Sequence, residues 1–177
     1  MKIVKKIAIV VMVIIAIPLI IAMFVNKEYA VEREVIINRP KADVFNYVKY
    51  LKNQDNYSKW VRLDPGMKKD FKGTDGSVGF VYAWDGNKDA GKGEQEIIKI
   101  TDGERIDVAV RFKKPMEGIA YTPIITEAVS ANQTKVKWGM KGFNKYPMNF
   151  INLFMDKMLG KDLDSSLVML KGILEKS

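Results

Sequence analysis

The stretch that decides the fold is residues 148–174, MNFINLFMDKMLGKDLDSSLVMLKGIL. Its apolar side chains recur at spacings of three and four, which predicts one amphipathic helix of about seven turns, interrupted only softly by Gly160. They are Ile151, Phe154, Met155, Met158, Leu159, Leu163, Leu167, Leu170 and Leu174. One face of so long a helix needs a large apolar surface to pack against.

The middle of the chain offers that surface, because its apolar residues alternate with polar ones. Period-2 patterns predict strands that each bury one face. The inward sets are Ile106, Val108, Val110 and Phe112; Val136, Trp138 and Met140; and Phe80, Tyr82 and Trp84. Another strand is predicted over 29–38, before Arg39-Pro40, and short helices over 42–48 and 55–60. The order is strand, two short helices, about six antiparallel strands and one long helix.

The N-terminus carries an unbroken apolar run, Ile7–Val25, preceded by three lysines. At 1.5 Å per residue the run spans about 28 Å as a helix, close to the hydrocarbon thickness of a bilayer. The basic flank predicts a cytoplasmic N-terminus with the remainder exported. A cleavable signal peptide is the alternative, but Glu28 stands where cleavage after Ala30 needs a small residue. We therefore expect an uncleaved signal anchor.

These segments divide the chain into a basic flank (1–6), a transmembrane signal-anchor helix (7–25), a short linker (26–28) and one domain (29–177). The predicted fold is α+β: a strongly curved antiparallel sheet of about seven strands wrapped around the long C-terminal helix. Two short helices follow the first strand, and the transmembrane helix precedes it. The predicted location is a bacterial plasma membrane, crossed once through residues 7–25, with the domain on the extracytoplasmic side.

Composition excludes several kinds of chemistry. The chain has no histidine and no cysteine, so Ser-His-Asp and Cys-His nucleophiles, disulfides and the usual zinc sites cannot be built. The net charge of +8 is spread over many lysines interspersed with acids, which gives little support to nucleic-acid binding. A near P-loop at 86–93 has Gly93 where Ser or Thr would hold magnesium, and the same stretch imitates a calcium loop poorly. We expect no cofactor and no metal.

Several short sequence fragments occur in an order that is typical of one protein superfamily. They are Val-Ile-Ile-Asn-Arg-Pro (35–40), Asp-Val-Phe (43–45), Trp60, Gly-Lys-Gly-Glu-Gln-Glu-Ile (91–97), Gly-Glu-Arg-Ile (103–106) and Thr-Lys-Val-Lys-Trp (134–138). In this order they resemble the START-like polyketide cyclase/dehydratase and lipid-transport superfamily (SRPBCC), over residues 29–176. The resemblance implies a helix-grip fold with a cavity for hydrophobic ligands between sheet and helix, here in a membrane-anchored bacterial member. It implies no particular reaction.

Aromatic and methionine side chains are the candidate ligand-binding residues. The expected cavity set is Trp60, Phe80, Tyr82, Trp84, Tyr121, Trp138, Phe154, Met155 and Met158. Glu96 joins the set if it points inward, where burial would raise its pKa and make it the one weak catalytic candidate. The alternatives are a closed core formed by the same residues, and an outward Glu96 paired with Arg105 or Arg111.

Three functions follow from these candidates. The leading prediction is a monomeric, non-catalytic domain that binds a lipid or a hydrophobic small molecule next to the membrane. The second is a cyclase- or dehydratase-like enzyme in which Glu96, Tyr82 or Tyr121 moves protons. The third is a protein-interaction module with a closed core and an exposed apolar patch.

Overall fold

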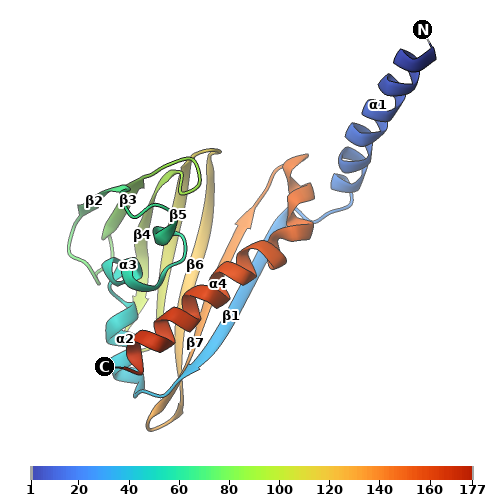
Figure 1. The fold of residues 1–177 in the computed structure, drawn as a ribbon. Helices are drawn as coiled ribbons and strands as arrows, with labels where there is room; N and C mark the ends of the chain where they lie inside the picture. Colours follow the sequence, from blue (N-terminus) through green and yellow to red (C-terminus); the bar gives the residue numbers. More distant parts are fainter. Residues whose placement is uncertain (1, 177) are drawn as a thin grey trace.

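The structure is a computed structural model that describes residues 2–176, and it confirms the predicted α+β, helix-grip architecture. A helix precedes one strand, a group of short helices, six further strands and a long helix (Figure 1). The helices are α1 (Lys2–Ala22), α2 (Lys41–Val48), η1 (Leu51–Asn53), α3 (Gln54–Tyr57), η2 (Val61–Leu63), η3 (Met148–Ile151) and α4 (Asn152–Leu174). The strands are β1 (Glu28–Ile37), β2 (Lys68–Lys72), β3 (Val81–Asp85), β4 (Lys92–Thr101), β5 (Arg105–Lys114), β6 (Gly118–Ser130) and β7 (Gln133–Phe143).

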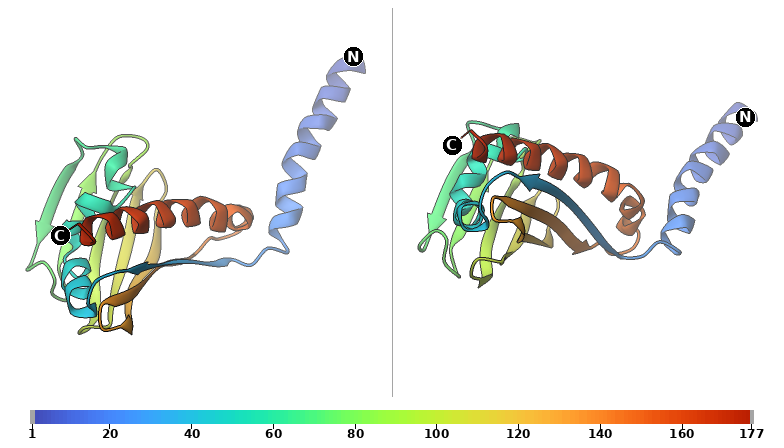
Figure 2. Two further views of the ribbon diagram at one scale, coloured as in Figure 1. Left: turned by 60° about the horizontal axis from the view of Figure 1, so that its bottom comes forward. Right: turned by 90° about the horizontal axis from the view of Figure 1, so that it is seen from below.

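One antiparallel sheet holds all seven strands, in the order β1-β7-β6-β5-β4-β3-β2. From β2 to β7 each strand pairs with the next in sequence, and β1 pairs with β7 at the other edge. The sheet curves around α4, which crosses its concave face and packs chiefly on β1 (Figures 1 and 2). The alternating residues predicted to point inward do so, as Val108, Val136 and Trp138 show by their burial.

The two ends of the sheet differ. At one end, which we call the α1 end, β1 begins and β7 stops near the exit of α1 (Figure 2), and the other strands have their corresponding ends further along the same edge of the sheet. Its strand ends, in sheet order, are Glu28, Phe143, Gly118, Lys114, Lys92, Asp85 and Lys68. The opposite end is covered by α2 and the last turns of α4. There Ile37, Val44, Leu51 and Leu170 are completely or almost completely buried, so that end is a packed core.

The N-terminal helix is displaced from its predicted bounds of 7–25, since α1 runs from Lys2 to Ala22. Lysines are good helix formers, so the helix begins within the basic flank. It ends early because the Asn149 side-chain nitrogen donates hydrogen bonds to the carbonyls of Ala22 (2.6 Å) and Val25 (2.8 Å), and the chain turns there. Apart from Lys5 and Lys6, residues 3–22 of α1 are apolar, and the helix is long enough to cross a bilayer. Ala22 is buried at the junction with the domain, and the preceding residues are exposed or only partly buried.

Two other helices also differ in their bounds from the prediction. The C-terminal helix predicted over 148–174 opens with the separate 3-10 turn η3 before α4 begins at Asn152. The second short helix, predicted over 55–60, is the single turn α3, and the 3-10 turn η2 follows it. These turns matter for function because α3 and η2 face the sheet across the cavity described next.

Candidate functional site

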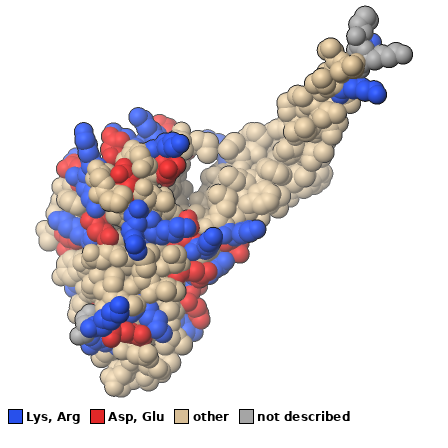
Figure 3. Space-filling model, viewed as in Figure 1, with Lys and Arg blue, Asp and Glu red and all other residues tan. Residues whose placement is uncertain are grey.

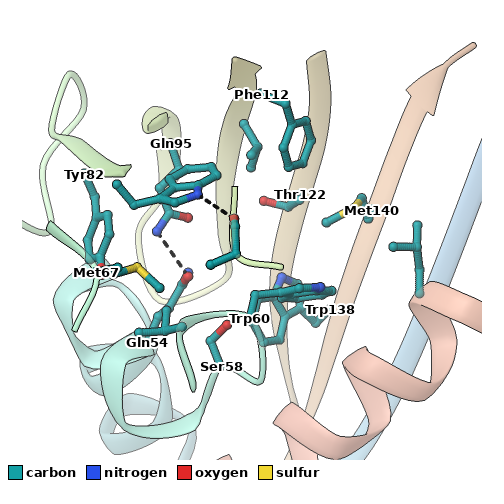
Figure 4. Close-up of a pocket in the computed structure, with 15 residues that line it drawn as sticks. Gln54, Ser58, Trp60, Met67, Tyr82, Gln95, Phe112, Thr122, Trp138 and Met140 are labelled. Atoms are coloured by element: carbon teal, nitrogen blue, oxygen red, sulfur yellow. Dashed lines mark hydrogen bonds between the residues drawn. The ribbon is translucent and has the colours of Figure 1, made fainter. Parts of the chain in front are cut away.

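A cavity of about 210 Å³ lies between the sheet, the α3–η2 segment and α4 (Figure 4). Its walls come from eight helices and strands and from the loops between them, so the whole domain forms the cavity. The lining residues are Gln54, Ser58, Trp60, Val61, Met67, Tyr82, Trp84, Ala90, Gln95, Val110, Phe112, Thr122, Trp138, Met140 and Leu159.

The three tryptophans of the chain all line this cavity, and each is held in place. Trp138 on β7 meets Trp60 edge-on, with ring centroids 5.8 Å apart. The Trp84 indole donates a hydrogen bond to the Ala90 carbonyl (3.0 Å) and meets Phe112 edge-on. Aromatic walls fixed in this way offer a large apolar contact area at little cost in side-chain entropy.

The polar groups of the wall are neutral. The Gln95 amide donates to the Gln54 side-chain oxygen at 3.3 Å, as Figure 4 shows, and the Ser58 and Thr122 hydroxyl residues lie in the same wall. Among the described residues that line the cavity, none is charged. Such a site suits an uncharged or weakly polar ligand, because nothing in the wall compensates the desolvation of a charge.

Tyr82 is the one lining residue connected to charged groups. Its hydroxyl donates to Asp55 at 2.7 Å, and the other oxygen of Asp55 is paired with Lys69 at 2.7 Å. Burial, together with this hydrogen bond, raises the pKa of Tyr82 well above its ordinary value. Burial also raises the pKa of Tyr57, whose ring packs edge-on against Trp138. Both phenols therefore stay protonated at neutral pH.

Four of the expected cavity residues come together at this site: Trp60, Tyr82, Trp84 and Trp138. Two others contribute to packing, since Phe80 is part of the buried core and Met155 is partly buried against it. The structure places the remaining four elsewhere. They are Glu96, Tyr121, Phe154 and Met158.

The strand register explains where Glu96 and Tyr121 point. On β4, Gln95 and Ile97 face the interior, so Glu96 between them faces outward and pairs with Arg111 at 2.7 Å. On β6, Tyr121 is flanked by the buried Ala120 and Thr122 and is exposed on the outer face. Phe154 and Met158 lie on the exposed side of α4.

Several uncharged residues that line the cavity were not predicted from the sequence. Gln54, Ser58 and Met67 come from the irregular segment between α2 and β2, where no periodic pattern marks an inward face. Gln95 and Thr122 carry a usable signal, because each alternates with an outward neighbour in a strand. A polar residue at an inward strand position next to a large apolar set is the pattern that identifies them.

The cavity occupies the α1 half of the interior. Trp84 adjoins the strand end at Asp85, Phe112 lies two residues before the end of β5, and Met140 three before the end of β7. The packed core fills the other half. Within residues 2–176, no group of three acidic side chains converges as a metal site would require.

Comparisons with known proteins match the fold and no sequence family. The sequence matches no protein-family profile and no curated protein. Among solved structures, norcoclaurine synthase from Thalictrum flavum, in complex with dopamine and hydroxybenzaldehyde, superposes with a TM-score of 0.64 at 13% identity. The alignment covers 89% of this chain and 92% of that one.

Two further structures extend the likeness. Ara h 8.0201 has a TM-score of 0.56 at 15% identity, covering 85% of this chain and 99% of its own. Protein CV1439 from Chromobacterium violaceum has a TM-score of 0.59 at 14% identity, covering 82% and 96%. At these identities the likeness establishes the fold alone, which is the Bet v 1-like helix-grip fold.

Proposed function

We propose that the chain is a membrane-anchored domain that binds a small apolar ligand in the cavity beneath its sheet. The observation that carries the proposal is an uncharged cavity into which all three tryptophans of the chain project. Binding at such a site needs no reactive group, because burial of apolar surface supplies about 25 cal/mol per Å².

The size of the cavity limits the ligand. An engineered cavity of roughly 150 Å³ accepts benzene, and this one measures about 210 Å³. It therefore suits a ligand with one or two rings, or one short segment of a lipid chain, and not an entire phospholipid. A ligand the size of an aromatic side chain buries roughly 150–250 Å², which corresponds to about 4–6 kcal/mol before the cost of association.

Anchoring is the second part of the proposal. Residues 3–22 form an exposed apolar helix twenty residues long, and Lys5 and Lys6 lie near its N-terminus. Lipid is the environment in which so apolar an exposed surface is stable. The positive-inside rule places the lysines in the cytoplasm and the domain on the extracytoplasmic side. A bacterial plasma membrane fits this arrangement.

Tryptophan fluorescence offers a direct test. The full chain is purified in a mild detergent, examined by native mass spectrometry for a co-purifying ligand, and titrated with 4-bromophenol, whose bromine quenches nearby indoles. We expect saturable quenching. Val110→Phe fills the lining and should weaken it several-fold, whereas Ile119→Phe, at an exposed position on the neighbouring strand, should leave it unchanged. Non-saturable quenching, or equal quenching in both variants, would contradict the proposal.

Acid–base catalysis is a second candidate, and the Tyr82–Asp55–Lys69 chain is the observation that favours it. Tyr82 is protonated and lines the cavity, so it can donate a proton or a hydrogen bond to a bound substrate. Tyr82→Phe keeps the ring and removes the hydroxyl. If the domain is a carrier, 4-bromophenol binding should change little. Loss of turnover of an identified substrate, with binding retained, would establish an enzyme instead.

A further inference from the structure

Large apolar side chains are exposed where α1 joins the domain. We define the junction surface as Phe143, Tyr146, Met148, Leu153, Phe154 and Met158, which lie at the end of β7, in η3 and its approach, and in the first turns of α4. Each is between 45% and 54% exposed. Exposed apolar residues scattered singly are ordinary, but a contiguous set drawn from one segment marks an interaction surface.

This surface is fixed beside the end of α1. Asn149 donates to the Ala22 and Val25 carbonyls, and the Asn152 side chain donates to the carbonyls of Asn26 (2.8 Å) and Lys27 (3.1 Å). The residues directly after α1 extend its apolar surface, because Met23 and Phe24 are both exposed, Phe24 to 84%. These hydrogen bonds therefore hold the junction surface close to the C-terminal end of α1.

The charges around this surface are mainly positive. Between residues 141 and 161 the chain carries Lys141, Lys145, Lys157 and Lys161, none of which forms a salt bridge within the described chain. The one acid in that range is Asp156, which is occupied by Arg33 at 3.0 Å. Figure 3 shows that the uncharged surface of α1 continues onto the adjoining part of the domain, where both basic and acidic groups lie nearby.

We propose that the junction surface lies within the interface of an anionic phospholipid bilayer, the same bilayer that α1 enters. The inference rests on the proposed anchoring by α1. Apolar and aromatic side chains fit the boundary between headgroups and acyl chains, and each nearby lysine adds about 1 kcal/mol of attraction to an anionic surface. Continuity with α1 and the excess of lysines favour a bilayer over a protein partner as the occupant.

The position of the cavity indicates a function for the contact between the junction surface and the bilayer. On α4, Leu159 lines the cavity, and Phe154 and Met158 lie beside it on the exposed side of the same turns. The cavity lies in the half of the interior that contains the α1 end of the sheet. The proposed membrane contact would bring that half towards the bilayer surface. An apolar ligand dissolved in the membrane can then pass into the cavity without crossing water, and entry into water is the main barrier to its transfer.

Site-specific labelling can test the contact, because the chain contains no cysteine. Phe154→Cys reports on the junction surface, Val168→Cys is its control on the exposed side of the far end of α4, and Ile14→Cys reports on α1 itself. Each full-length variant is labelled with the fluorophore NBD and reconstituted in vesicles of phosphatidylcholine with phosphatidylglycerol. Quenching by spin-labelled lipid is then compared among the three sites.

We expect strong quenching at positions 14 and 154, several-fold above that at position 168. The signal at 154 should fall in pure phosphatidylcholine, and also when Lys157 and Lys161 are replaced by glutamine. Quenching at 14 with a water-exposed label at 154 would overturn the membrane contact while leaving the anchor intact. Water exposure at both positions would overturn the anchor and the contact together. Protection at 154 without lipid quenching would indicate a protein partner and also overturn the proposal.

Discussion

Truncation of two leucines on α4 should separate a cavity wall from a packed core. Leu163 is completely buried among core side chains, whereas Leu159, one turn earlier on the same helix, is only partly buried and lines the cavity. Each Leu→Ala change removes the same atoms from the same helix. A difference in their effects therefore measures the environment of the side chain and not helix propensity.

The expected magnitudes differ for a physical reason. Leu163→Ala removes about three carbons from a packed site, which costs about 2.4 kcal/mol in transfer free energy at 0.8 per group. The new void adds to this, giving a total of about 2.7–5 kcal/mol. Leu159→Ala enlarges space that already exists and removes a side chain that is partly solvated. We expect it to cost about 1 kcal/mol, so the two variants should differ by about 2 kcal/mol.

The assay is urea unfolding of the full chain in one detergent, followed by the fluorescence of the three cavity tryptophans. At an equal slope, a loss of 2 kcal/mol lowers the midpoint by about 1 M for a slope near 2 kcal/mol/M. Leu159→Ala should also tolerate a bulkier probe than 4-bromophenol. Equal destabilisation by the two variants would refute the reasoning, since it would mean that the cavity is closed and packed in solution.

Three further predictions concern the supporting structure. A Cβ added at Gly160 would clash with the Arg33 guanidinium, so Gly160→Ala should displace that group from its exposed partners Asp156 and Asp164. The gain of about 1 kcal/mol in helix propensity opposes this loss, and the urea midpoint should hardly change. The hydrogen bond from Lys113 lowers the pKa of Glu94 in the folded state, so its stabilisation is complete above the unfolded pKa near 4.5 and is lost as the pH falls below it. Lys113→Ala should flatten that acid-induced loss in pH-dependent unfolding. Asn149→Ala removes two hydrogen bonds of about 1 kcal/mol each at the end of α1, and amide exchange should accelerate at residues 22–27 only.

Sequence periodicity predicted most of the helices and strands, and the resemblance to the SRPBCC superfamily supplied their helix-grip arrangement. Two-residue alternation identified β1, β3, β5 and β7, and the three-to-four spacing identified α4. The edge strand β2, Lys-Lys-Asp-Phe-Lys, was not identified from the sequence because four of its five residues are charged. Charged residues protect exposed sheet edges from pairing with other chains, and the same protection removes the apolar signal on which strand prediction depends.

The cavity was only partly predictable, because it depends on register and on side-chain direction. The sequence shows that Glu94 and Glu96 lie on one face of the strand and Gln95 and Ile97 on the other. It does not show which of the two faces points inward. The start of α4 presents a different difficulty, since Leu153, Phe154 and Met155 are consecutive apolar residues. Periodicity cannot assign an inward face to such a run, and two of its three members prove to be exposed.

The contrast between the two ends of the domain connects stability with binding. Residues that line a cavity lose the dispersion contacts that a filled core would give them. A domain of this size can therefore retain a cavity only if another region is well packed. Here Leu163, Leu167 and Leu170 of the C-terminal half of α4 are buried, and the helix packs against β1, β7 and α3. The N-terminal half of the same helix borders the cavity and the junction surface instead. The α4 helix therefore stabilises the fold at one end and borders a cavity at the other, and this division accounts for the exposure of Phe154 and Met158, which the sequence assigned to the cavity.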